Sequence, residues 1–181
     1  GFKSPRIVYR NLGNGKFKDV SAQLGPGVTA RWSSRGCAFG DFDNDGDVDV
    51  LVLNMNDKPS LLRNDGGNKN NWITIKLIGT KCNRTAVGAR VRVVTGKRTQ
   101  IDEVHTGYSV MSQSDLRLHF GLGQATKIDS IEVKWPTLVT ENKNGKPTEV
   151  PQIEKFTNVE ANQFLTIKEG SGIIKREKPK A

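Results

Sequence analysis

Apolar and polar residues alternate along several segments of this chain. Ile73, Ile75 and Leu77 fall on one face of a predicted strand, while Thr74 and Lys76 fall on the other. A period of two is typical of β-strands with one buried face. Helical periodicity of useful length is absent, so the sequence predicts an all-β fold. Four further segments also predict strands: 48–53, 89–93, 131–135 and 165–168.

Polar stretches divide the chain into predicted domains. Residues 65–71 predict a linker, so we place a boundary after residue 66, and residues 140–147 predict a loop between two strands. The last eleven residues are rich in lysine and nearly without large apolar side chains, which predicts a flexible tail. The predicted domains are therefore 1–66, 67–170 and a basic tail, 171–181.

A weak internal repeat connects residues 8–13 with residues 61–66, at an offset of 53 residues. Repeats of about 40 to 50 residues built from short strands are typical of β-propeller blades, although two similar hairpin turns are the alternative. A propeller needs about four or more blades, and this chain holds one blade and the end of another. We therefore expect the C-terminal segment of a longer protein, or a propeller completed by another chain.

Five aspartates occupy alternate positions of one nine-residue segment that also contains Gly46. Two carboxylates about 5 Å apart repel by roughly 3 kcal/mol at an effective dielectric constant of about 20, so a tight loop of this composition requires a cation. Oxygen ligands at alternate positions, a backbone carbonyl near the end of the loop and a glycine for the sharp turn suit Ca²⁺. The predicted ligands are Asp41, Asp43, Asp45, Asp49 and, through its carbonyl, Asp47.

Two further observations limit what this loop can be. The twelfth position holds Val52 instead of the glutamate of an EF-hand, and no helix is predicted beside the loop. No histidine or candidate nucleophile adjoins the aspartates, so the predicted role of the metal is structural and the protein is predicted not to be an enzyme. A solvated acidic turn and a magnesium or manganese site are the weaker alternatives, because Mg²⁺ favours fewer protein ligands and keeps its waters.

The remaining candidate residues carry weaker signals. His105 and His119 lie in alternating segments and are predicted to pack or form hydrogen bonds rather than to ligate a metal. Residues 107–111 begin like a nucleophile elbow but lack its closing glycine. The polar cluster 112–115 predicts a turn, with a binding surface as the alternative.

Covalent modification is left open by the sequence. Cys37 and Cys82 are either a disulfide pair, in an oxidising compartment, or two small buried residues. Residues 83–85 match the N-glycosylation sequon at Asn83, although chance matches are common.

Several ordered segments carry a family resemblance that covers about residues 1–170. Residues 35–49 resemble the FG-GAP or VCBS-type repeat of integrin-like β-propellers. Four later segments are similar to the ASPIC/UnbV domain: 83–91, 112–123, 133–136 and 156–163. The resemblance implies C-terminal blades of a β-propeller plus a small β-sandwich-like domain, and calcium at the five aspartates. The sequence departs from the family pattern after Trp135-Pro136. Where the family usually has Ser-Gly, this chain has Thr137-Leu138 and then an added polar segment.

The excess of basic over acidic residues raises the question of an anionic binding partner. The chain has 28 basic and 19 acidic residues, and setting aside the five loop aspartates leaves 14 acids against those 28 basic residues. Aromatic residues do not interleave with the basic ones, so we expect no nucleic-acid partner. A solvated charged face is the main interpretation, with binding of an anionic glycan as the alternative. The basic residues concerned are Arg90, Arg92, Lys97 and Arg98.

These observations together predict a function. No apolar run approaches the roughly 20 residues of a membrane span. The resemblance implies a secreted, extracellular or cell-surface location, with the periplasm as an alternative. We predict a non-catalytic, calcium-stabilised adhesion or scaffold module that recognises a protein or a glycan. The alternative is an accessory or catalytic part of a larger secreted or biosynthetic enzyme.

Overall fold

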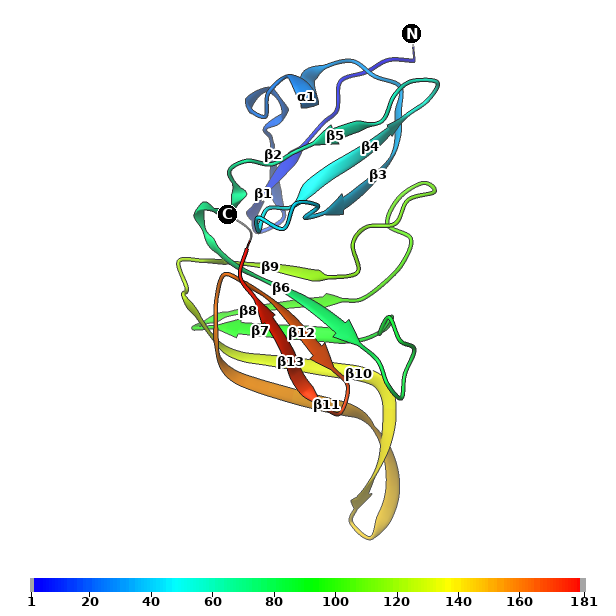
Figure 1. The fold of residues 1–181 in the computed structure, drawn as a ribbon, viewed down its shortest axis with the longest axis vertical. Helices are drawn as coiled ribbons and strands as arrows, with labels where there is room; N and C mark the ends of the chain where they lie inside the picture. Colours follow the sequence, from blue (N-terminus) through cyan, green and yellow to red (C-terminus); the bar gives the residue numbers. More distant parts are fainter. Residues whose placement is uncertain (1, 180–181) are drawn as a thin grey trace. The chain divides into compact units, whose positions relative to one another are not determined.

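The computed structural model describes residues 2–179, and nearly all of its regular structure is β (Figure 1), which confirms the predicted fold class. The described chain divides into two compact units, which we describe separately. The first comprises the chain up to Gly40, Asp49–Asn64 and Gly107–Ser114. The second comprises Asp41–Val48, Asp65–Thr106 and the chain from Asp115 onward. Residues 41–48, which interrupt the first unit in sequence, therefore belong to the second, and residues 107–114, which interrupt the second, belong to the first. The predicted domain boundaries stay a prediction.

The first unit contains two small antiparallel sheets. One is a hairpin with a bulge, and the other has three strands in the order β3-β4-β5. Short helices lie between the hairpin and β3, and Val28 of α1 is buried. The elements are β1 (Tyr9–Gly13), β2 (Lys16–Asp19), η1 (Ser21–Gln23), α1 (Pro26–Thr29), β3 (Ser34–Gly40), β4 (Asp49–Asn54) and β5 (Ser60–Leu62).

The second unit is a β-sandwich of two four-stranded sheets, ordered β11-β10-β7-β8 and β13-β12-β6-β9. Strand pairs are antiparallel except β6 with β12, which are parallel. A short η2 (Gly67–Lys69) precedes the strands. These are β6 (Asn71–Ile78), β7 (Arg90–Thr95), β8 (Arg98–Glu103), β9 (Leu118–Gly123), β10 (Lys127–Lys143), β11 (Lys146–Glu160), β12 (Gln163–Lys168) and β13 (Gly172–Glu177).

The core of the sandwich is built from the alternating apolar residues of both sheets. Ile73, Ile75 and Leu77 of β6 are buried, as the period of two predicted, and so are the apolar residues of the other central strands. Trp135 is the largest fully buried side chain of the described residues. The buried residues of the facing strands are Val91, Val93, Ile131, Val133, Leu165 and Ile167.

The prediction of a loop over residues 140–147 is wrong. β10 continues to Lys143 and β11 begins at Lys146, so the connection is only the two residues Asn144 and Gly145. Both have positive φ values, 56° and 79°, which the Asn-Gly dipeptide adopts readily in a type I′ hairpin turn. The added polar segment therefore forms the end of a long two-stranded ribbon, which extends beyond the sandwich in Figure 1.

The prediction of a flexible tail is also wrong for residues 172–177. These residues form β13, which pairs antiparallel with β12 at the edge of the sheet. A turn with glycines at positive φ, Gly170 and Gly172, reverses the chain. Ile173 then packs against the core, so one apolar side chain and ladder hydrogen bonds order a segment whose composition is otherwise that of a tail.

A buried carboxylate holds the end of the sandwich together. Glu169 is only 2% exposed, and its Oε2 accepts hydrogen bonds from the backbone N–H groups of Thr80 (2.8 Å), Lys81 (2.8 Å) and Cys82 (3.1 Å). The hydroxyl of Thr137 donates to Oε1. Although burial opposes ionisation, these hydrogen bonds together lower the pKa of Glu169 from 4.5 to about 2.

We expect Glu169→Gln to lower the free energy of unfolding at neutral pH by roughly 3 kcal/mol, because a depressed carboxyl pKa stabilises the folded state by about 1.4 kcal/mol per unit. The stabilisation is present above pH 4.5 and is lost as the pH falls from 4.5 toward about 2. Denaturant unfolding across this range measures it. The exposed Glu149→Gln is the control, and equal stability of Glu169→Gln and the wild type at pH 7 would contradict the assignment.

Candidate metal centre

The aspartate-rich loop, residues 41–48, leads directly into β4, whose first residue is Asp49. Side-chain-to-backbone hydrogen bonds close it. The Asp41 carboxylate accepts from the N–H groups of Asp45 (3.2 Å) and Gly46 (3.0 Å), and the Asp45 carboxylate accepts from Asp47 N–H (2.8 Å). Gly46 has a φ of 102°, so the freedom predicted for this glycine is used.

Three of the five predicted ligands come together. Asp41, Asp43 and Asp49 each offer a carboxylate oxygen, and these oxygens all lie within 4.8 Å of one another. Asp41 and Asp49 are buried, and Asp43 is half-buried. Such a group of oxygen donors fits a hard divalent cation of the Ca²⁺ type.

One atom in this group supports the fit independently. Asp43 Oδ1 is buried and, among residues 2–179, has no hydrogen-bond partner. A buried carboxylate oxygen without a partner is costly. In the same described part of the chain, no lysine or arginine forms an ion pair with the carboxylates of Asp41, Asp43 or Asp45. A bound cation would therefore satisfy groups that the protein itself does not.

The other two aspartates lie outside this group. The Asp45 carboxylate is used within the loop, and the Asp47 carboxylate, which is buried, accepts a hydrogen bond from Gly67 N–H (2.9 Å). The Asp47 side chain therefore anchors the segment that leads to β6. The assignment of Asp45 and Asp47 as ligands stays a prediction.

The electrostatics of the loop favour a cation. Burial raises the pKa of Asp41 above its ordinary value, and Asp45 adds to this effect by charge repulsion. Hydrogen bonds from the Gly46 and Asn44 backbone and the charge of Arg117 act in the opposite direction. A divalent ion in the loop would favour the ionised form and so reverse the net shift.

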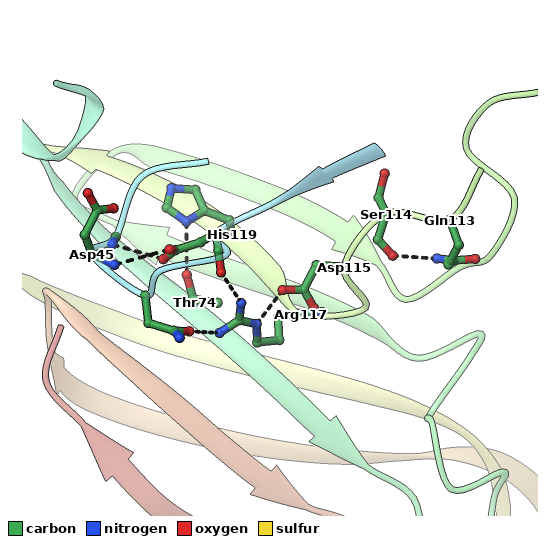
Figure 2. Close-up of polar contacts among 10 residues, drawn as sticks. Asp45, Thr74, Gln113, Ser114, Asp115, Arg117 and His119 are labelled. Atoms are coloured by element: carbon green, nitrogen blue, oxygen red, sulfur yellow. Dashed lines mark hydrogen bonds and ion pairs between the residues drawn. The ribbon is translucent and has the colours of Figure 1, made fainter. Parts of the chain in front are cut away.

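Arg117 is a functional candidate that the sequence did not single out. Its guanidinium donates from Nη2 to the Asp41 carbonyl (2.7 Å) and from Nη1 to Asn44 Oδ1 (2.7 Å), and Nε forms an ion pair with Asp115 (Figure 2). The signal that could have found it is only that Arg117 stands two residues after an aspartate, which is too common to indicate a site.

Trp72 is a second residue that sequence reasoning did not connect with the loop. Its indole packs directly on Gly46, where any side chain would meet the ring. The buried indole also stacks on His119, with ring centroids 5.8 Å apart. The absence of a side chain at Gly46 therefore allows both the turn and the contact with the sandwich.

The two histidines differ in their surroundings. His119 Nδ1 lies 3.0 Å from Thr74 Oγ1 (Figure 2), and burial followed by the charge of Arg117 lowers its pKa below the ordinary value. This agrees with the predicted packing and hydrogen-bonding role. His105 is exposed, and its Nδ1 lies 2.9 Å from the Glu103 carbonyl.

The polar cluster 112–115 shapes a turn and also contacts β3. Within the first unit, Ser112 donates to the Val110 carbonyl (2.9 Å), and Ser114 Oγ accepts from Phe39 N–H of β3 (3.1 Å). The cluster thus shapes a turn, as the turn interpretation predicted. It also provides a hydrogen-bond acceptor for a backbone N–H group of β3.

The two cysteines are free thiols, and the asparagine of the sequon is exposed. Cys37 and Cys82 are both half-buried free thiols, so the structure contains no disulfide between them. Burial raises the pKa of Cys82, and neighbouring Glu169 raises it further. Asn83 is exposed, and its amide bonds to both backbone groups of Val87.

Comparison with known proteins agrees with these observations. The family model described as "ASPIC and UnbV" matches residues 79–174, and the one described as "FG-GAP-like repeat" matches residues 4–52. Cartilage acidic protein 1 of Xenopus tropicalis is 29% identical over 167 residues, which cover 81% of this chain and 25% of that protein. Cartilage acidic protein 1 of Homo sapiens is 30% identical over 139 residues, which cover 72% of this chain and 20% of that protein.

The chain thus spans a quarter or less of the length of these relatives. Both predicted motif families are confirmed, in the predicted order. Within residues 2–179, no helix has the length and apolar character to cross a bilayer.

We expect Gly46→Ala to lower the free energy of unfolding by roughly 3 kcal/mol. A side chain at a φ of 102° costs about 1–2 kcal/mol, and its overlap with the Trp72 indole costs about 1–3 kcal/mol. Chemical denaturation measures the change. Gly121→Ala is the matched control, because its φ is ordinary and its added Cβ meets open space. A Gly46→Ala protein as stable as that control would show that the contact is not tight.

Proposed function

This chain belongs to the ASPIC and UnbV family, and we propose that it is a non-catalytic, calcium-stabilised binding or scaffold module that works outside the cytoplasm. The observation that carries the proposal is the aspartate loop. Asp41, Asp43 and Asp49 converge, and a buried oxygen of Asp43 lacks a hydrogen-bond partner among the described residues. A cation in this position would hold the β3–β4 connection in one conformation.

The proposed metal is Ca²⁺, held by Asp41, Asp43 and Asp49 and, as predicted from the spacing, by Asp45 and the Asp47 carbonyl. Its chemical contribution would be to neutralise charge and hold the loop in one conformation. The proposed location is secreted, extracellular or at the cell surface, with the periplasm as the alternative.

The proposed first partner is the remainder of a β-propeller, supplied by a longer form of this chain or by another chain. On one face of the β3-β4-β5 sheet, Leu51, Leu53 and Leu61 are 42%, 46% and 50% exposed, and Leu51 and Leu61 are direct cross-strand neighbours. An apolar sheet face of this kind usually packs against another layer. A neighbouring blade is the layer that a propeller would place there.

The proposed ligand of the assembled module is a protein or an anionic glycan. On β7, Arg90 forms an ion pair with Glu103 (3.5 Å), and Arg92 lies opposite Glu132 of β10. These two arginines therefore belong to a mixed charged face. Lys97 and Arg98, at the β7–β8 turn, are exposed and lie outside that pairing. They are the better candidates for contact with a polyanion.

We expect Ca²⁺ to raise the thermal unfolding midpoint relative to excess chelator, because a ligand at 100 times its dissociation constant stabilises the folded state by about 2.7 kcal/mol. Asp43→Asn should abolish most of this increase. Asp102→Asn, outside the loop, is the matched control. Equal wild-type midpoints with Ca²⁺ and with chelator, together with no metal in elemental analysis, would contradict the proposal.

We expect retention on heparin that falls as salt concentration rises, because the basic surplus acts through screened electrostatics. The double substitution K97Q/R98Q should elute at lower salt than the wild type. The control R90Q/E103Q removes an ion pair without changing the net charge. Salt-independent retention, or equal elution of K97Q/R98Q and the wild type, would count against a polyanion partner at this turn.

A further inference from the structure

Arg117 holds the aspartate loop from outside at two points. One guanidinium nitrogen bonds the main-chain carbonyl of Asp41, and another bonds the side-chain oxygen of Asn44, each at 2.7 Å. Asn44 has a φ of 61°, in the left-handed region, so its side chain is placed by a turn that few residues other than asparagine and glycine adopt. The planar fork therefore fixes the distance between the first and fourth residues of the loop.

Arg117 makes these contacts without neutralising the carboxylates of the loop. Its acceptors there are a carbonyl and an amide oxygen, and its ionic partner is Asp115. Asp115 also accepts a hydrogen bond from the backbone N–H of Arg117 (2.9 Å), which orients the side chain. The arginine charge is thus paired outside the loop, and the carboxylates of Asp41 and Asp43 are left for a cation.

Packing restricts the guanidinium further. It lies over the ring of Phe164 at 5.4 Å, and Phe164 meets the edge of Trp72 with ring centroids 4.9 Å apart. Trp72 in turn packs on Gly46 of the same loop. The loop is therefore held by a closed series of contacts that begins and ends in residues 41–48. Rigid support of this kind positions metal ligands beyond the ligands themselves.

We propose that Arg117 is a positioning residue for calcium binding, and that its guanidinium sets the affinity of the loop for Ca²⁺ by fixing Asp41 and Asn44. Asp115 orients the guanidinium. The inference rests on the proposed function, because it requires that the loop binds Ca²⁺. Phe164, over which the guanidinium lies, belongs to β12 of the sandwich.

The test compares R117K, D115N and the control R92K, an exposed conservative change on β7. Ca²⁺ affinity is measured by isothermal titration calorimetry, and unfolding midpoints are measured in Ca²⁺ and in chelator. We expect R117K to weaken Ca²⁺ binding at least tenfold, because one ammonium group cannot replace a three-nitrogen fork. D115N should weaken binding severalfold, and R92K should leave it unchanged.

The increase in unfolding midpoint that Ca²⁺ produces distinguishes a positioning role of Arg117 from a purely structural role. R117K should reduce that increase, whereas a structural role would lower both midpoints equally and leave the affinity unchanged. Wild-type affinity in R117K overturns the inference alone, and absence of Ca²⁺ binding by the wild type overturns the proposed function. Should R117K not fold, D115N carries the test, because it lies outside the loop, and wild-type affinity in D115N overturns the inference.

A second readout uses Tb³⁺ in place of Ca²⁺. Because the Trp72 indole packs on the loop, its excitation should sensitise emission from a bound Tb³⁺. R117K should shift the Tb³⁺ titration to at least tenfold higher concentration. W72F should remove most of the sensitised signal. A titration of R117K that superimposes on that of the wild type would overturn the inference.

Discussion

The carboxylates of residues 41–49 repel one another, and the contacts around this loop oppose that repulsion. A segment with five negative charges stays folded only if its backbone and its surroundings oppose that repulsion. The backbone contributes N–H donors to Asp41 and Asp45, and Arg117 binds the Asp41 carbonyl instead of a carboxylate of the loop. At Asp43, a buried carboxylate oxygen has no hydrogen-bond partner within the described chain. An ion is the simplest group that could occupy this position.

Glu169 is also a buried carboxylate, but its hydrogen-bonding needs are met by the chain itself. There a single carboxylate is satisfied completely by the chain, through three backbone N–H groups and the Thr137 hydroxyl. One anion that receives four donors stabilises the fold, whereas several anions that share too few donors create a need for a ligand. The contrast explains why one acidic site is structural in itself and the other is a candidate binding site.

Period-two alternation was sufficient to predict the all-β class and the core face of β6, because burial on one side of a strand leaves a direct record in the sequence. The loop was predictable because its aspartates are adjacent in the chain. Arg117 and Trp72 were not, since their roles depend on contacts with residues 26 to 76 positions away. The 140–147 error had a different cause: Asn144-Gly145 is a hairpin signal, and the polar composition around it concealed the strands.

The long β10–β11 ribbon has a consequence for how this domain can vary in length. A register irregularity between Lys134 and Leu138 separates the ribbon from the sandwich-forming part of β10. Beyond it, Leu138–Lys143 pair only with Lys146–Pro151, so no core residue depends on the number of pairs. Residues can therefore be gained or lost in matched pairs, one on each strand, while Asn144-Gly145 still closes the turn. The length of the ribbon can therefore change without a change in the core of the sandwich.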